Sequence, residues 1–280
     1  MIKKFCLLLF IAQLFYVGHA NAQLSIFGNQ SRRSFFGYRP IGLIDMPTAN
    51  ILTEGTSQYE NTKKYFQLSL RVYGEGGMIG GIKVGLTNHL MFGVTYGGQN
   101  LIGSGDINWN PNPGIQIRYQ LFSESYPFPP AIAIGYNSQG YGAYNTEFSR
   151  YENKSQGLYI AASKNYNVTA LAMGMHGGIN FSGEQSGSQD KDLNIFFGAH
   201  LVMEEELSLV WEYDLGINDN SEQSFGAGKG YMNAAVRWLF MNRLIIEFSI
   251  KNLLKNRKNA AGEVIPYTNR ELKIIYQQLL

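Results

Sequence analysis

Apolar and polar residues alternate along much of the chain from Lys64 onward. The alternation has a period of two residues and is clearest over residues 66–72, 115–121, 207–215 and 236–240. Because successive side chains of a β-strand point to opposite faces, each run predicts a strand with one apolar and one polar face. No helical period is present in this part of the sequence.

The same pattern, bounded by turn residues, divides the chain into a series of about twelve strands. The predicted strands are residues 65–73, 78–86, 89–97, 114–121, 131–136, 157–166, 168–181, 193–203, 207–215, 230–240, 243–251 and 269–280.

The connections between these strands alternate in length. Short links are expected at 87–88, 167, 204–206 and 241–242, and long polar links at 98–113, 137–156, 182–192, 216–229 and 252–268. Two links depart from the alternation: 74–77 is short where a long one is due, and 122–130 is long where a short one is due. Outer-membrane barrels combine short periplasmic turns, long outer loops and an even strand number. The sequence therefore predicts an all-β antiparallel transmembrane β-barrel over residues 65–280, with both termini in the periplasm.

A soluble secreted β-sandwich is the competing fold, because its strands also alternate between apolar and polar residues. A sandwich has no reason to sort its connections by length, so the loops favour the barrel. The period alone does not say which face meets lipid.

The N-terminus has the three parts of a secretory signal. Lys3 and Lys4 precede an apolar run over residues 5–17, and Ala20-Asn21-Ala22 follows it as a cleavage site. This order predicts a signal peptide over residues 1–22. The single cysteine, Cys6, lies within it, so the mature chain is expected to have no disulfide and no thiol site.

Residues 23–64 are more polar than the rest and are interpreted as a periplasmic leader or plug ahead of the barrel. Within them Pro47 is expected to open a short helix and Gly55 to end it.

The segment 41–50, Ile-Gly-Leu-Ile-Asp-Met-Pro-Thr-Ala-Asn, with Gly55 after it, resembles the start of YjbH-like outer-membrane proteins. The glycine-rich residues 73–96 are more loosely similar. The motif consists of Gly42, Asp45, Pro47, Ala49 and Gly55. Full-length members of that family are much longer, so the chain resembles one barrel unit. The resemblance implies a β-barrel associated with exopolysaccharide export or surface assembly, with polysaccharide-export proteins as partners. It carries over no catalytic residue.

Composition and charge agree with a barrel. The chain has 23 Lys and Arg against 21 Asp and Glu, and loss of Lys3 and Lys4 with the signal leaves 21 of each sign. This balance provides no basic field for nucleic acid. The 32 Gly, 18 Tyr and 17 Phe suit tight turns, strands and an interfacial aromatic girdle. The expected location is the outer membrane, in contact with its lipid and lipopolysaccharide.

Four residues on the predicted lumen face have side chains that could carry chemistry: His176, His200, Glu212 and Asp214. The expected register makes His176 and His200 diagonal neighbours, and Glu212 a diagonal neighbour of His200. Two imidazoles and a carboxylate suit a metal ion or acid–base catalysis. A polar lumen lining explains the same residues without either. We therefore predict no catalytic, cofactor or metal site.

Other lumen-facing charges have mixed signs and are expected to pair across the narrow interior. They are Arg71, Lys83, Arg118, Arg237, Glu247, Lys251 and Lys273. The basic residues Lys251, Lys255, Arg257 and Lys258 are assigned to the last long loop, either solvated or in contact with anionic polymer. Ser163 and Ser249 lie on strands, but neither has a histidine at a suitable offset for a serine nucleophile.

The predicted function is thus a non-enzymatic outer-membrane barrel linked to exopolysaccharide export or envelope assembly. A small general porin for solutes is the alternative, and a lipid-modifying barrel enzyme is a further one.

Overall fold

The computed structural model describes residues 39–54, 63–125, 128–168, 171–184, 190–203, 206–221, 224–240, 243–259 and 262–280. The predicted signal peptide, the start of the leader and Gly55 lie outside the described residues, as do parts of the short links at 204–206 and 241–242.

Every regular element in the described ranges is a strand. The strands are β1 (Thr53–Glu54), β2 (Lys63–Tyr73), β3 (Gly77–Gly85), β4 (Leu90–Gln99), β5 (Asn108–Trp109), β6 (Gly114–Phe122), β7 (Ala131–Asn137), β8 (Tyr141–Asn145), β9 (Arg150–Asn153), β10 (Gly157–Val168), β11 (Leu171–Phe181), β12 (Asn194–Met203), β13 (Leu207–Asp214), β14 (Tyr231–Phe240), β15 (Leu244–Lys251) and β16 (Asn269–Leu279). No described segment forms a helix long and apolar enough to cross a bilayer.

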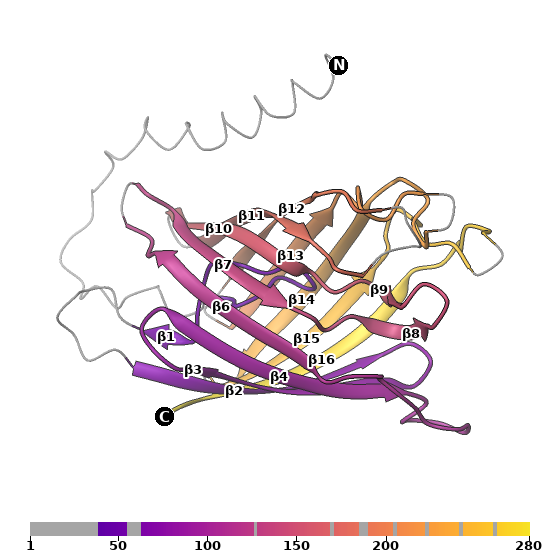
Figure 1. Ribbon diagram of the computed structural model, residues 1–280. Helices are drawn as coiled ribbons and strands as arrows, with labels where there is room; N and C mark the ends of the chain where they lie inside the picture. Colours follow the sequence, from indigo (N-terminus) through magenta and orange to yellow (C-terminus); the bar gives the residue numbers. More distant parts are fainter. Residues whose placement is uncertain are drawn as a thin grey trace, which may run out of the picture.

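Twelve of the described strands form a closed antiparallel barrel (Figure 1). Their order around the barrel is β2, β16, β15, β14, β13, β12, β11, β10, β7, β6, β4 and β3. The ring closes because β2 pairs with β16 on one side and with β3 on the other. The predicted barrel is confirmed, and all twelve predicted strands occur close to their expected positions.

The alternation within each strand separates a lipid-type exterior from a polar interior. In β13, Leu207, Leu209 and Trp211 are exposed, whereas Ser208 and Glu212 are buried. The same outward set of large apolar side chains continues around the barrel, including Ile117, Ile134, Val236 and Phe248. An apolar outer surface around a polar lumen is typical of a transmembrane β-barrel. The period of two therefore arises from lipid on one side and the lumen on the other.

The connections that follow β4, β7, β11, β13 and β15, which were predicted to be long, lie at one end of the barrel, opposite the start of β2 and the end of β16 (Figure 1). One of them contains the hairpin β8–β9, which the sequence pattern did not predict. The expected short link at Asn167 was wrong, because β10 continues through Val168 and Asn167 pairs with Ala172. The strand predicted over 168–181 accordingly begins at Leu171.

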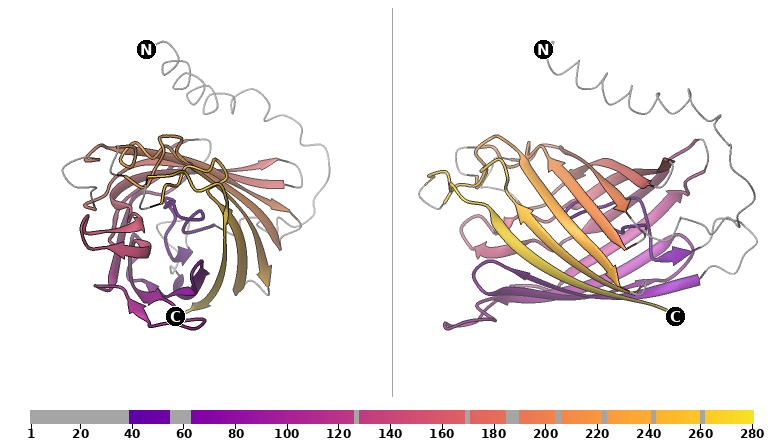
Figure 2. Two further views of the ribbon diagram at one scale, coloured as in Figure 1. Left: turned by 90° about the vertical axis from the view of Figure 1, so that its right-hand side faces the viewer. Right: turned by 180° about the vertical axis from the view of Figure 1, so that it is seen from behind.

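Residues 39–54, called the plug below, lie inside the barrel (Figure 2). Their turn is closed by an isolated bridge between Gly42 and Pro47 and by a hydrogen bond of 2.8 Å from Leu43 N to Met46 O. The predicted helix at Pro47 was wrong. Wall side chains, bonds within the turn and the pairing of β1 with β2, rather than a helical hydrogen-bond ladder, satisfy the backbone groups of this segment.

A charge placed on the outer wall tests this assignment of faces. Val236 lies midway along β14 with 43% of its surface exposed. We expect Val236→Arg to destabilise the barrel in phospholipid vesicles by about 2–4 kcal/mol, because a guanidinium near the bilayer midplane is poorly solvated. Denaturant unfolding of refolded protein measures the change. Val236→Leu is the matched control, and equal stability of the Arg and Leu variants would contradict the assignment.

Candidate functional site in the barrel lumen

The turn of the plug presents three consecutive backbone N–H groups to one wall carboxylate. Ile44 N and Met46 N donate to Oε2 of Glu212 over 2.9 and 3.1 Å, and Asp45 N lies 3.0 and 2.9 Å from its two oxygens. Glu212, on β13, is completely buried. Successive N–H groups in a turn form a concave anion site, and hydrogen bonds to an ionised group are the strong ones. Glu212 thus anchors the tip of the plug.

The carbonyl groups of the plug are held by cationic side chains from other strands. Arg237 on β14 donates to Gly42 O and Leu43 O over 3.0 and 2.7 Å. Arg118 on β6 donates to Ile41 O and Asn50 O over 2.6 and 2.5 Å. Lys273 on β16 donates to Ile44 O. These contacts bind the plug from opposite sides of the barrel and depend on backbone groups only.

Glutamines provide two further contacts to plug carbonyls. Gln120 on β6 donates to Ala49 O over 2.9 Å, and Gln156, just before β10, donates to Asp45 O over 2.6 Å.

The side chain of Asp45 joins the plug to a network of ions. Its carboxylate lies 2.7 Å from Arg71, contacts Lys251, and accepts a hydrogen bond of 3.0 Å from the Tyr141 hydroxyl. Burial would raise the pKa of Asp45, but the cations Lys251, Arg71 and Lys273 outweigh it and hold that pKa well below its usual range. The carboxylate therefore stays ionised, and its ion pairs persist, at neutral and mildly acidic pH.

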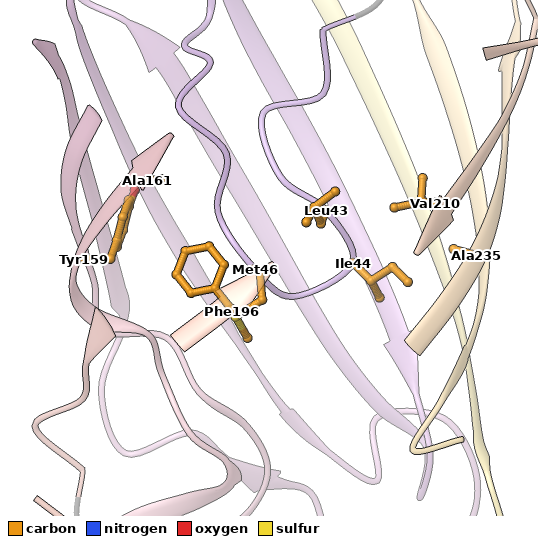
Figure 3. Packing of buried hydrophobic residues seen from close by; sticks show 8 residues of the cluster. All are labelled: Leu43, Ile44, Met46, Tyr159, Ala161, Phe196, Val210 and Ala235. Atoms are coloured by element: carbon orange, nitrogen blue, oxygen red, sulfur yellow. The ribbon is translucent and has the colours of Figure 1, made fainter. Parts of the chain in front are cut away.

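Apolar contacts complete the fit of the plug. Leu43, Ile44 and Met46 pack with a set of wall residues that are also buried (Figure 3). Those wall residues are Tyr159, Ala161, Phe196, Val210 and Ala235. At Gly198 an added Cβ would lie only 2.6 Å from Cδ1 of Leu43, so the wall there approaches the plug as closely as glycine permits.

The structure brings His176 and His200 together and adds Ser163 to them. His176 Nε2 lies 2.9 Å from His200 Nδ1, and His176 Nδ1 lies 2.8 Å from Ser163 Oγ. The expectation that Ser163 has no histidine partner was wrong, because Ser163 on β10 is paired directly with His176 on β11. All three side chains are buried.

The serine hydroxyl in this group is occupied by the plug. Ala49 N donates to Ser163 Oγ over 2.8 Å, and only 1% of Ser163 is exposed. The hydroxyl can then donate to Nδ1 of His176, and Nε2–H of His176 to Nδ1 of His200, so that neutral imidazoles satisfy the whole chain. With the plug in place the group is a polar support for Ala49 and offers no access to a substrate.

The two carboxylates of the predicted cluster have other partners. Glu212 binds the plug and accepts a hydrogen bond of 2.8 Å from Asn233 Nδ2. Asp214 Oδ1 accepts hydrogen bonds from Asn194 Nδ2 and Gly216 N over 2.6 and 2.8 Å. Within the described ranges no three His, Cys, Asp or Glu side chains converge as a metal site requires.

Most lumen charges are paired with one another. Glu247 lies 2.5 Å from Arg237 and 3.0 Å from Lys273, and Glu271 lies 2.5 Å from Arg71 and 3.4 Å from Lys251. In the last long loop, Arg257 contacts Glu152 at 3.4 Å and Lys258 donates to Ser221 O over 3.1 Å. Lys251, by contrast, belongs to the lumen network and not to that loop's surface.

A cavity of about 230 Å³ remains beside the plug. Its lining includes plug residues, wall residues near the termini such as Gln277, and outer residues such as Tyr141 and Asn218. The plug therefore leaves an unfilled space beside it, lined by residues from both ends of the barrel.

No known family model matches the chain, and no curated protein is significantly similar to it. Among solved structures, the KdgM porin has a TM-score of 0.42 and 10% identity, covering 76% of this chain and 98% of the porin. Omp33 of Acinetobacter baumannii has a TM-score of 0.43 and 9% identity, covering 77% and 98%. An outer membrane channel from Pseudomonas putida F1 has a TM-score of 0.40 and 10% identity, covering 81% and 100%. Likeness at this level says nothing of what this chain binds or transports.

Removing the Glu212 carboxylate should loosen the plug tip. In Glu212→Ala three buried N–H groups lose their acceptor, a loss on the order of 3 kcal/mol. We expect amide hydrogen exchange at Ile44, Asp45 and Met46 to become roughly a hundredfold faster, since about 1.4 kcal/mol corresponds to tenfold.

Glu212→Gln keeps one carbonyl acceptor and should have an intermediate effect. Glu147→Gln, at an exposed loop position, is the control. Unchanged exchange at the three amides in Glu212→Ala would show that the carboxylate does not hold the plug.

Proposed function

We propose that this chain is a non-enzymatic outer-membrane barrel whose lumen is closed at rest by the plug, and that it serves export or surface assembly of polysaccharide. The observation that carries this proposal is that side chains of β6, β10, β13, β14 and β16 bind the backbone groups of the plug. In this proposal both termini face the periplasm, and the apolar belt contacts outer-membrane lipid and lipopolysaccharide.

The strength of the plug contacts argues against a permanently open pore. Each hydrogen bond to a charged group contributes about 1.5–3 kcal/mol, and at least five wall side chains make such bonds or ion pairs to the plug. Displacing the plug requires a partner or ligand that favours the displaced state by a comparable amount. Periplasmic polysaccharide-export proteins are the partners that fit this role in the proposal.

The polysaccharide part of the proposal is supported by the place of the motif in the fold. Gly42, Asp45, Pro47 and Ala49, which carry the resemblance to YjbH-like proteins, all belong to the plug. Gly42 and Pro47 close its turn, Asp45 enters the ion network, and Ala49 binds Ser163. The motif thus coincides with the segment that determines whether the lumen is open.

A small porin is the second candidate. The cavity beside the plug supports it, because that space is lined by residues near both ends of the barrel. A porin would pass small solutes along this space while the plug stays docked.

Conductance in planar bilayers separates the two candidates. For the plugged barrel we expect wild-type protein to show almost no steady current. The double variant Glu212→Ala, Arg118→Ala should show open channels, because five backbone groups of the plug have lost their wall partners. Glu147→Gln again serves as control. If the wild-type protein forms stable open channels, and the double variant forms channels of the same conductance, the result favours the porin and contradicts closure by the plug.

Deletion of the gene tests the physiological role. We expect secreted polysaccharide to fall under conditions that induce its production, and to recover when the wild-type chain is supplied. Unchanged polysaccharide output in the deletion strain would refute the proposed role, whatever the conductance.

A further inference from the structure

A row of lumen-facing polar residues crosses five neighbouring strands beside the plug. Gln277 on β16 is paired with Gln67 on β2, Gln67 with Lys83 on β3, Lys83 with Gly93 on β4, and Gly93 with Gln116 on β6. The row starts near the free ends of β16 and β2 and reaches the loop end of β6. Strands of a closed barrel are tilted, so a row of paired residues climbs along the barrel axis.

The four polar side chains of this row all lack protein partners. Across the described part of the chain, the side chains of Gln67, Lys83, Gln116 and Gln277 make no hydrogen bond or ion pair. All four line the cavity of about 230 Å³. A polar group in a lumen costs free energy unless water or a ligand satisfies it, so the row is available for binding.

Lys83 is the one basic side chain of the row. The charged groups that act on it are the cations Arg118 and Lys273, with no carboxylate among them. An added Cβ at Gly93 would lie 2.8 Å from Cγ of Lys83, so the absence of a side chain there makes room for the lysine. The cavity is lined by more Lys and Arg than Asp and Glu, and in the described part of the chain neither Lys83 nor Arg118 forms an ion pair with a carboxylate, which favours an anionic ligand.

We propose that this row is a binding track for an acidic saccharide, with the Lys83 ammonium on its carboxylate and the glutamine amides on its hydroxyls. An amide both donates and accepts, as a hydroxyl requires, and an ammonium forms charge-assisted hydrogen bonds with carboxylate. The cavity is smaller than the ~300–1,000 Å³ of ordinary small-molecule sites, so with the plug docked it suits a short saccharide and not a whole polymer. The track rests on the proposed function and names its substrate class.

Calorimetric titration of the detergent-solubilised mature protein tests the track with three probes. D-galacturonate has the carboxylate and the hydroxyls, D-galactose lacks the carboxylate, and acetate lacks the sugar ring. We expect wild-type protein to bind galacturonate at least about tenfold more tightly than galactose or acetate. The carboxylate that galactose lacks is worth about one charge-assisted hydrogen bond, and the hydroxyls that acetate lacks are worth about two neutral hydrogen bonds.

Two variants divide the contributions. Lys83→Met should weaken galacturonate binding about tenfold, to the level of galactose, and Gln116→Ala should weaken both sugars and leave acetate unchanged. Lys255→Met, in the exposed last loop, is the matched control and should bind like wild type. Equal binding of galacturonate and galactose by wild-type protein overturns the track, as does full galacturonate affinity in folded Lys83→Met.

These results are separable from the proposed function. Loss of polysaccharide on gene deletion without galacturonate binding would refute the track alone. Galacturonate binding with normal polysaccharide output would refute the export role and keep the track as a site for acidic sugars.

Discussion

A peptide segment enclosed in a barrel must have its backbone N–H and C=O groups satisfied even where it has no strand partner. In this chain the wall meets that need with charged side chains. Glu212 takes the N–H groups of the plug tip, while Arg118, Arg237 and Lys273 take its carbonyls. Where the plug presents N–H groups the facing wall residue is acidic, and where it presents carbonyl groups the facing wall residues are basic.

The same constraint explains the pairing of ions in the lumen. Arg237 and Lys273 bind both the plug and Glu247, and Arg71 binds both Asp45 and Glu271. Each cation is shared between plug and wall, so removing the plug would leave part of its charge unsatisfied. Among the described wall residues Lys83 differs, since neither the plug nor a carboxylate reaches it, and for that reason we place the charge of the proposed ligand there.

The barrel was largely predictable from sequence because lipid and lumen impose opposite demands on neighbouring residues. Leu209 and Trp211 point outward and Glu212 inward, and this alternation is legible without a structure. Local signals failed where partners come from far along the chain. Pro47 suggested a helix start, but its segment is held by residues more than sixty positions away.

The Ser163–His176 contact was missed for a geometric reason. A turn centred on Asn167 would pair Ser163 with Leu171, whereas the actual register pairs it with His176. Small errors in a turn displace every cross-strand pair that follows it. His176 and His200 flank a loop whose centre was placed correctly, and their proximity followed from that. The role of Glu212 could not be derived in this way, because periodicity says that a residue faces the lumen and not what enters the lumen.

The carboxylate of Glu212 reads only main-chain atoms of Ile44, Asp45 and Met46. These hydrogen bonds do not depend on which side chains occupy those positions, except that proline is excluded because it has no N–H group. At this point the barrel wall recognises the backbone conformation of the plug. Substitutions at the tip of the plug therefore leave the hydrogen bonds to Glu212 possible. Related barrels whose tips differ in sequence could be closed in the same way.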